Sequence, residues 1–258
     1  MTARSSSPDW KAWLRRWDKQ QASLLPSRER RFHIMLDVLE ATVGRSPRVL
    51  DLGSGPGSLS FRVLQRFPHA RCVAVDYDPV VLRIGQGALG SYRGRLTWVD
   101  AKLGAPGWTR RLPPGKFDAA ISTTALHWLP PASLRRVYRD LGGLLRVGGV
   151  FLNGDHLAWG SEDPRLTRLS RRVYRVHRHG RKPEVGWGAW DRWWRDAGRV
   201  PALAPSFAEH RRRQAQHPRH DTPPLPLNAH VRALRKAGFR TVTVVWQIID
   251  NRVLFAQR

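Results

Sequence analysis

Three glycines that alternate with other residues mark the stretch of this chain best suited to chemistry. Gly53, Gly55 and Gly57 follow a short apolar run and precede a helical pattern, and Asp51 lies just before them. A strand that leads through glycines into a helix gathers free backbone N–H groups and the positive end of a helix at one point. Because glycine has no side chain, a ligand can pack directly against such a backbone. The turn predicts a nucleotide-type binding site.

The spacing of these glycines argues against a dinucleotide site. In the pattern G-x-G-x-x-G the third glycine would fall on Ser58. The chain reads D-x-G-x-G-x-G instead, which resembles the first signature of the class I S-adenosylmethionine-dependent methyltransferases, in particular their small-molecule, type 11/12-like members. The alternative is a glycine-rich turn that binds nothing. The resemblance implies S-adenosyl-L-methionine as the cofactor, and its contacts in this turn would be Asp51, Gly53, Ser54, Gly55 and Gly57.

Two later apolar runs also end in acidic residues, Asp76 and Asp100. In open parallel sheets, an acid at the end of the second strand reaches the ribose hydroxyls of a bound nucleoside. The resemblance assigns this role to Asp76 and assigns the adenine amino group to Asp100, with help from the backbone of Ala101. Tyr77 would lie on the adenine face or serve as a packing residue. For Asp100, the alternative is a surface carboxylate that caps a loop.

The elements that position these residues form an alternating pattern. Apolar runs at 48–52, 71–78, 96–100 and 117–122 predict parallel strands, and 144–155 predicts a helix end, a glycine turn and the fifth strand. The runs at 239–249 and 252–256 predict a terminal hairpin. Thr123, at the end of the fourth strand, joins the expected cofactor contacts. The predicted fold class is α/β, with a Rossmann-like, seven-stranded, mostly parallel sheet, an antiparallel C-terminal hairpin strand and a helical lid insertion.

Four regions follow from this pattern. Residues 1–27 form a helical lead-in or cap, 28–155 the cofactor-binding core, 156–226 the lid insertion, and 227–258 the helix and hairpin that complete the core. Gln20 and Gln21 are expected between the first two helices, where they bond the cofactor or substrate or remain in a solvated loop. The insertion is rich in arginine. Its tryptophans either line an aromatic substrate pocket or pack the insertion against the rest of the fold, and they are Trp187, Trp190, Trp193 and Trp194.

Composition limits the partners and the compartment. The formal net charge of +25 permits a nucleic-acid partner, but the excess of Arg over Lys also fits a compositional bias, and no nucleic-acid-binding signature accompanies it. A lone Cys72 allows no disulfide framework, and no apolar run approaches the ~20 residues of a membrane span. We therefore expect a cytoplasmic protein without a membrane partner, of undetermined oligomeric state.

Two histidines are candidate general bases. His127 follows the predicted fourth strand and His156 the fifth, and ligands bind at these strand ends in open α/β sheets. Two other groups of histidines lack Cys or acidic residues at ligand spacing, so no metal site is predicted; these are His177 with His179, and His210 with His217 and His220. The expected function is methyl transfer to a small molecule, with an aromatic or an acidic acceptor as the candidates. An RNA methyltransferase and a non-catalytic cofactor-binding or scaffold protein are the alternatives.

Overall fold

The computed structural model describes residues 7–25, 27–160, 163–178, 187–216 and 225–258. Parts of the predicted lead-in (1–6 and 26) and of the predicted insertion (161–162, 179–186 and 217–224) lie outside the described residues, as does the side chain of Trp187. Within the described ranges, seven strands form one sheet in the order β3-β2-β1-β4-β5-β7-β6. The strands are β1 (Arg48–Leu52), β2 (Arg71–Asp76), β3 (Leu96–Asp100), β4 (Phe117–Thr123), β5 (Leu145–His156), β6 (Thr241–Ile248) and β7 (Asn251–Gln257).

The pairing within the sheet confirms the predicted fold class. Strands β1 to β5 pair in parallel, whereas β7 runs antiparallel between β5 and β6. The apolar runs are buried on both faces, as expected for parallel strands with helices on each side. The carboxyl ends of β1, β2 and β3 therefore meet at one edge, and Asp76 is the register partner of Asp100.

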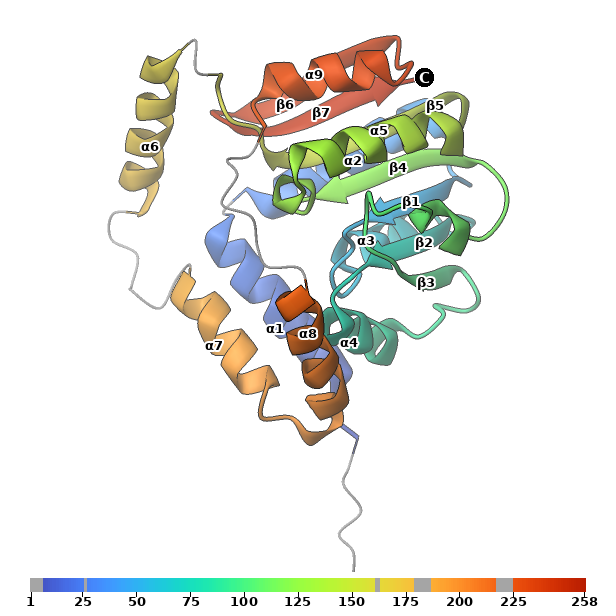
Figure 1. Cartoon of the computed structure of the whole chain (residues 1–258), viewed down its shortest axis with the longest axis vertical. Helices are drawn as coiled ribbons and strands as arrows, with labels where there is room; N and C mark the ends of the chain where they lie inside the picture. The colour runs from blue at the N-terminus through green and yellow to red at the C-terminus, as the bar shows by residue number, and fades with distance from the viewer. Residues whose placement is uncertain (1–6, 26, 161–162, 179–186, 217–224) are drawn as a thin grey trace, which may run out of the picture.

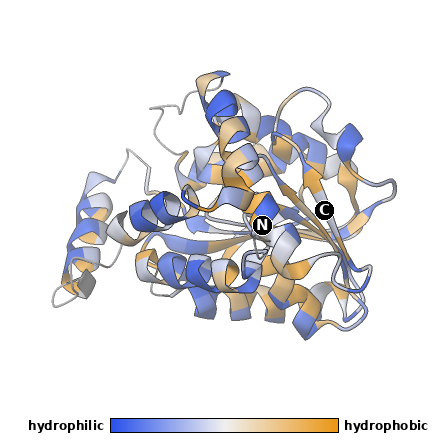
Figure 2. Cartoon of the chain, turned by 90° about the horizontal axis from the view of Figure 1, so that it is seen from below, coloured by the Kyte–Doolittle hydropathy of each residue, from blue (hydrophilic) through white to orange (hydrophobic). Residues whose placement is uncertain are grey.

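Helices cover both faces of the sheet (Figures 1 and 2). Helices α2 (Arg28–Val43) and α3 (Ser58–Arg66) pack on one face through residues such as Met35 and Val63. On the other face, α5 (Pro131–Leu144) and α9 (Leu227–Lys236) pack through Val137 and Leu234. The short 3-10 helices are η1 (Trp108–Arg111), η2 (Leu126–Trp128) and η3 (Pro201–Leu203).

A separate cluster of helices is built on α4 (Pro79–Leu89). Helices α1 (Trp10–Leu24), α7 (Trp187–Ala197) and α8 (Ala204–Gln216) gather there, while α6 (Pro164–Arg178) lies apart (Figure 1). The small core of this cluster combines Ile84 of α4 with Trp193 of α7, which is 2% exposed. Trp193 makes edge contacts with Trp13 and Trp17 of α1. The tryptophans described here therefore pack the insertion against the N-terminal helix.

Helix α1 is longer than its sequence pattern predicts. The apolar spacing indicates a short helix around Trp10–Trp17, but α1 continues to Leu24. Gln20 and Gln21 consequently lie on the helix and are buried. Their burial contradicts the alternative of a solvated loop. The cause is tertiary, because packing against α4 and α7 stabilises a helix well beyond what local propensity provides.

Candidate active site

The glycine turn joins β1 to α3 at the carboxyl edge of the sheet. Gly53, Gly55 and Gly57 all have positive φ, a backbone conformation that disfavours other residues. The N–H groups of Gly53 and Ser54 donate to the Val75 carbonyl at 2.8 and 3.0 Å, which fixes the turn beside the end of β2. A Cβ added to Gly53 would lie 2.3 Å from that of Ala125, so the loop after β4 also requires glycine here.

Asp51 is a buried carboxyl directly beneath this turn. One of its oxygens accepts hydrogen bonds from the N–H and hydroxyl of Ser60, at 3.1 and 2.7 Å. The other oxygen, Oδ1, is buried without a hydrogen-bond partner. Burial raises the pKa of Asp51 to about 7, although the Ser60 hydrogen bonds oppose the rise. An unpaired buried oxygen at a binding turn suits a cationic or hydrogen-donating ligand group.

Asp76 closes the other side of the turn. Its carboxylate accepts the Gly55 N–H at 2.7 Å and the N–H groups of Tyr77 and Asp78 at 2.7 and 2.9 Å. Burial raises the pKa of this carboxyl to about 6, against the opposing effect of its backbone donors. Asp76 thus holds the turn in shape, and hydroxyl groups of a nucleoside would have to share or replace these donors.

Asp100 and its neighbour are engaged differently. Both oxygens of Asp100 accept from Arg213 of α8 at 2.7 Å, and the Ala101 N–H donates to the Asp76 carbonyl at 2.9 Å. The Arg213 guanidinium also lies over the Tyr77 ring, 4.6 Å from its centroid. The residues predicted for the adenine edge therefore lie together, with an arginine of the insertion among them.

His127 is paired with an acid that the sequence reasoning missed. In the loop after β4, its Nδ1 lies 2.7 Å from Oδ1 of Asp155, a fully buried residue of β5, whose Oδ2 has no partner. Burial alone would lower the pKa of His127, but the Asp155 carboxylate outweighs it and raises that pKa. The ring is about a quarter exposed, at 23%. An imidazole oriented through Nδ1 presents Nε2 for proton transfer.

The second candidate base, His156, has a looser environment. Its ring is 38% exposed and its Nδ1 lies 3.5 Å from Asp250. Tyr174 of α6 packs against the ring and donates its hydroxyl to the same carboxylate at 2.6 Å. His156 therefore lies beside α6, across β5 from the side chains of Asn153 and Asp155.

A buried arginine adjoins the end of β4. Arg31 of α2 is fully buried and donates to Thr123 Oγ1 at 2.6 Å and to Asn251 Oδ1 at 3.0 Å. Its Nε has no partner, and no carboxylate forms an ion pair with it in the part of the chain that is described. Burial lowers its pKa to about 10, although Asp155 opposes the fall. The side-chain amide of Asn153 is also buried and unpaired, but it lies on the other face of β5, since Arg31 lies over Gly154.

Helix α1 closes over the glycine turn. A Cβ at Gly55 would touch the Trp17 ring at 3.5 Å, and Asp18 accepts the Ser58 hydroxyl at 2.6 Å and an Arg28 N–H at 2.9 Å. Both polar atoms of the Gln20 side chain are buried without partners. Helix α1 thus lies against the glycine turn through Trp17 and Asp18, and its Gln20 amide is buried and unsatisfied.

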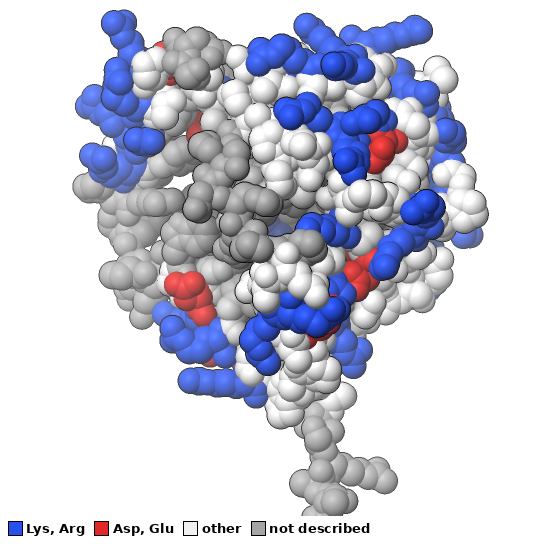
Figure 3. Space-filling model, viewed as in Figure 1, with Lys and Arg blue, Asp and Glu red and all other residues white. Residues whose placement is uncertain are grey.

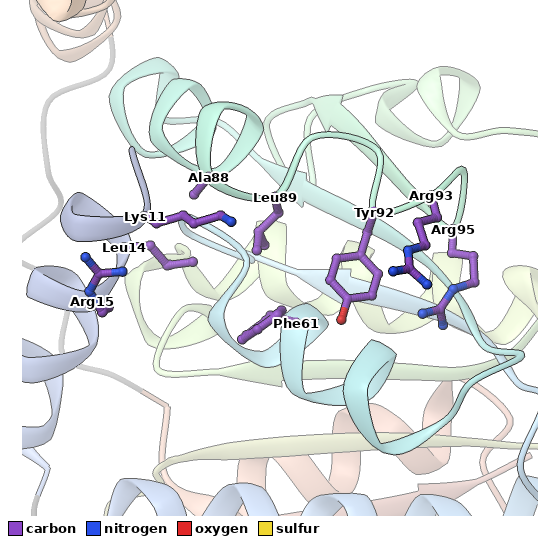
Figure 4. A pocket seen from close by; sticks show the side chains of 9 residues that line it. All are labelled: Lys11, Leu14, Arg15, Phe61, Ala88, Leu89, Tyr92, Arg93 and Arg95. Carbon is purple, nitrogen blue, oxygen red and sulfur yellow. The ribbon is translucent and has the colours of Figure 1, made fainter. Parts of the chain in front are cut away.

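A different pocket lies away from the strand ends. It lies between α1, α3 and α4 and has a volume of about 660 Å³. Phe61 and Tyr92 line it, with their two rings in edge-to-face contact (Figure 4). Lys11, Arg15 and Arg93 add positive charge at its rim. Basic side chains are also scattered over the face in Figure 3, where acidic ones are few. No helix in the described ranges is long and apolar enough to cross a membrane.

Comparison with known proteins finds a methyltransferase domain in this chain. Residues 49–149 match the family model described as a methyltransferase domain. An uncharacterized methyltransferase of Mycobacterium tuberculosis (strain ATCC 25618 / H37Rv) is 37% identical over 102 residues, which cover 40% of this chain and 47% of that protein. A trans-aconitate 2-methyltransferase of Azoarcus sp. (strain BH72) is 31% identical over 135 residues, covering 52% of this chain and 48% of that protein. The matched segments span about half the length of these curated relatives.

Solved structures extend the likeness of fold over nearly the whole chain. An O-methyltransferase family protein from Burkholderia thailandensis aligns with a TM-score of 0.57 and 20% identity, covering 94% of this chain and 59% of that one. The pyocyanin biosynthetic protein PhzM aligns with a TM-score of 0.54 and 18% identity, over 97% of this chain and 62% of that one. Residues 49–149 thus match a methyltransferase domain, and the chain shares its fold with solved methyltransferase structures.

Proposed function

We propose that the protein transfers a methyl group from S-adenosyl-L-methionine to a small molecule. The observation that carries this proposal is the placement of Asp51, Asp76 and Asp100 at the ends of three adjacent parallel strands, beside the glycine turn. Carboxylates at this edge suit the amino and hydroxyl groups of a nucleoside that also carries an ammonium. The methyltransferase domain of 49–149 supports the same assignment.

The residues of the chain fit this cofactor by their chemistry. The buried, unpaired Oδ1 of Asp51 and the turn at Gly53–Gly57 would receive its amino-acid part, with Ser54 and Thr123 at the flanks. Asp76 would take the ribose hydroxyls, and Asp100, Ala101 and Tyr77 would form the adenine edge. When bound, the cofactor supplies an electrophilic methyl group on a good, neutral leaving group.

His127 is the proposed general base for an acceptor that arrives protonated. Asp155 holds its Nδ1 and stabilises the imidazolium that would form at Nε2. Because the pKa of His127 is raised, the free imidazole that accepts the proton forms at higher pH than in an ordinary histidine, and it is a stronger base. His156, with its longer ion pair and greater exposure, is the second candidate.

The acceptor that the site favours is an acid. Arg31 is a fully buried cation whose two hydrogen-bond partners are neutral. The Asp155 carboxylate offsets part of its charge but is itself paired with His127, so an anionic group of the acceptor would compensate Arg31 further. A trans-aconitate 2-methyltransferase among the relatives is named for an acidic substrate. The tryptophans of the insertion pack against α1, so they give less support to an aromatic acceptor.

Calorimetry with S-adenosylhomocysteine tests the cofactor assignment. The wild-type protein should bind, and Asp76→Asn should weaken binding by about tenfold or more, since it removes a charged acceptor for the ribose. Asp118→Asn is the matched control, because Asp118 lies at the opposite end of β4, where it accepts the Arg48 N–H at 2.7 Å. Absence of binding at millimolar ligand would rule out the proposed cofactor.

The two alternatives make different predictions. An RNA methyltransferase should bind RNA with an affinity that falls steeply with salt, and only the basic surface and the pocket of Figure 4 favour this possibility. A non-catalytic protein should bind S-adenosylhomocysteine yet transfer no label from a radioactive methyl donor to any component of a small-molecule extract. Labelling of acid-extractable metabolites supports the proposed function.

A further inference from the structure

An arginine of helix α8 holds the edge at which the adenine ring is expected. The guanidinium of Arg213 donates to both oxygens of Asp100 at 2.7 Å and to the backbone carbonyl of Tyr77 at 2.6 Å. Two parallel hydrogen bonds to one carboxylate form the strongest class of side-chain pair. Both Asp100 oxygens therefore have a charged donor before any ligand arrives.

The same helix covers the remaining surface of this edge. The Arg213 guanidinium lies 4.6 Å from the centroid of the Tyr77 ring, in the position of a cation–π contact. Glu209 accepts the Arg213 Nε at 2.6 Å, which fixes the direction of the side chain. His210, one helical turn away, lies 2.9 Å from Asp78 at the start of α4. Arg213 thus joins α8 to the ends of β2 and β3, His210 joins it to the start of α4, and Glu209 holds Arg213 from within the helix.

Helix α8 has little apolar burial to hold it in place. None of its residues from Ala204 to Gln216 is buried. Its main apolar contact is Phe207, which is partly buried against the cluster on α4 and touches Trp194. Ion pairs that keep one partner partly exposed contribute only modest stability. Helix α8 can therefore leave this edge at a smaller cost than a helix held by a buried apolar face.

We propose that Arg213 is a latch that competes with the adenine group of the cofactor for Asp100 and Tyr77. This inference rests on the proposed function, because it assigns Asp100 to the adenine amino group. In the latched state the arginine occupies the acceptor that the amino group needs. Binding of the nucleoside therefore requires Arg213 to leave Asp100, and the latch sets the affinity for the cofactor rather than the chemistry of transfer. The apparent dissociation constant of the ligand is then its intrinsic value divided by the fraction of protein that is unlatched.

Affinity for S-adenosylhomocysteine in Arg213→Gln tests the latch. Calorimetry should show binding about fivefold tighter than in the wild type, or more. A fivefold change is the lower end of the usual coupling between a conformational equilibrium and ligand binding. Arg212→Gln is the matched control, because Arg212 binds Glu209 of its own helix through both Nε and Nη2, at 2.7 Å each. This control should bind as the wild type does. Thermal unfolding of each variant checks that the fold is retained.

Hydrogen exchange gives a second readout that needs no turnover. On addition of S-adenosylhomocysteine to the wild type, amides of α8 should exchange faster while those of α4 keep their protection. Equal affinity in Arg213→Gln and wild type, or weaker binding in the variant, would overturn the latch while leaving the cofactor assignment intact. If none of the three proteins binds the ligand, the proposed function fails and the latch fails with it.

Discussion

Replacing Asp51 by asparagine should stabilise the free protein, and the gain should grow with pH. Asp51 is 1% exposed, and burial raises its pKa from an ordinary value of 3.8 to about 7. The folded state therefore retains a proton that the unfolded state has lost between these two values. Because the folded state binds more protons, stability falls as the pH rises through this window and reaches its lower level above the folded pKa.

The size of the effect follows from the pKa. Each pH unit within the window changes the free energy of unfolding by about 1.4 kcal/mol, so the interval from pH 5 to pH 7 changes it by about 2–3 kcal/mol. The amide introduced by Asp51→Asn would keep the Ser60 hydrogen bonds through its carbonyl oxygen and would carry no charge. The free energy of unfolding of Asp51→Asn minus that of the wild type should thus increase by about 2–3 kcal/mol between pH 5 and pH 8.

Urea unfolding at several pH values measures this difference directly. The control is Asp37→Asn, because the Asp37 side chain is 57% exposed in its ion pair with Arg66. Because this carboxyl is exposed, the control lacks the burial on which the Asp51 effect depends, and it should give one offset at every pH. A difference for Asp51→Asn that stays constant within about 0.5 kcal/mol across the range would refute the reasoning. The same variant should bind S-adenosylhomocysteine more weakly, since the unpaired Oδ1 is lost.

Three further changes probe other parts of the molecule. Asp155→Asn should lower the methyl-transfer rate and the pKa of His127. The lower pKa should shift the midpoint of the rate–pH profile to lower pH, and an unshifted midpoint would exclude His127 as the base. Gly87→Ala places a Cβ 2.4 Å from the Trp10 ring and should destabilise the protein by about 1–3 kcal/mol in thermal unfolding; an unchanged midpoint would contradict the docking of α1 on α4. Arg93→Glu at the rim of the basic pocket should lower the salt concentration needed to elute the protein from heparin, and an unchanged elution point would exclude that pocket from polyanion binding.

Local sequence pattern accounts for most of the sheet. Each predicted parallel strand is an apolar run that ends near a turn residue, and such runs identify strands without knowledge of their partners. Two β-branched runs around Asp250 and Asn251 predict the terminal hairpin, and the structure has β6 and β7 there. The glycine turn and the acids of β2 and β3 can be placed because each comes at the end of a recognisable strand.

The missed partners are all distant in sequence. Asp155 lies 28 residues after His127, and Arg213 lies 113 residues after Asp100. Periodicity tells which face of a helix is apolar, but it does not tell which element covers that face. The only local signal is an acid at the end of the fifth apolar run, where Asp155 repeats the pattern of Asp76.

The three carboxylates of the strand ends differ in what a ligand must displace from each. Asp51 has one oxygen without a partner, so a donor from the ligand adds a hydrogen bond and relieves the penalty of a buried group. Asp76 already accepts three backbone N–H groups that also shape the turn, so a hydroxyl there must share its oxygens with them. Asp100 is held by a guanidinium from α8, so a ligand must compete with a charged donor. Contacts near Asp51 therefore strengthen binding of the ligand, whereas contacts near Asp100 first have to displace Arg213. Movement of helix α8 would remove this competition.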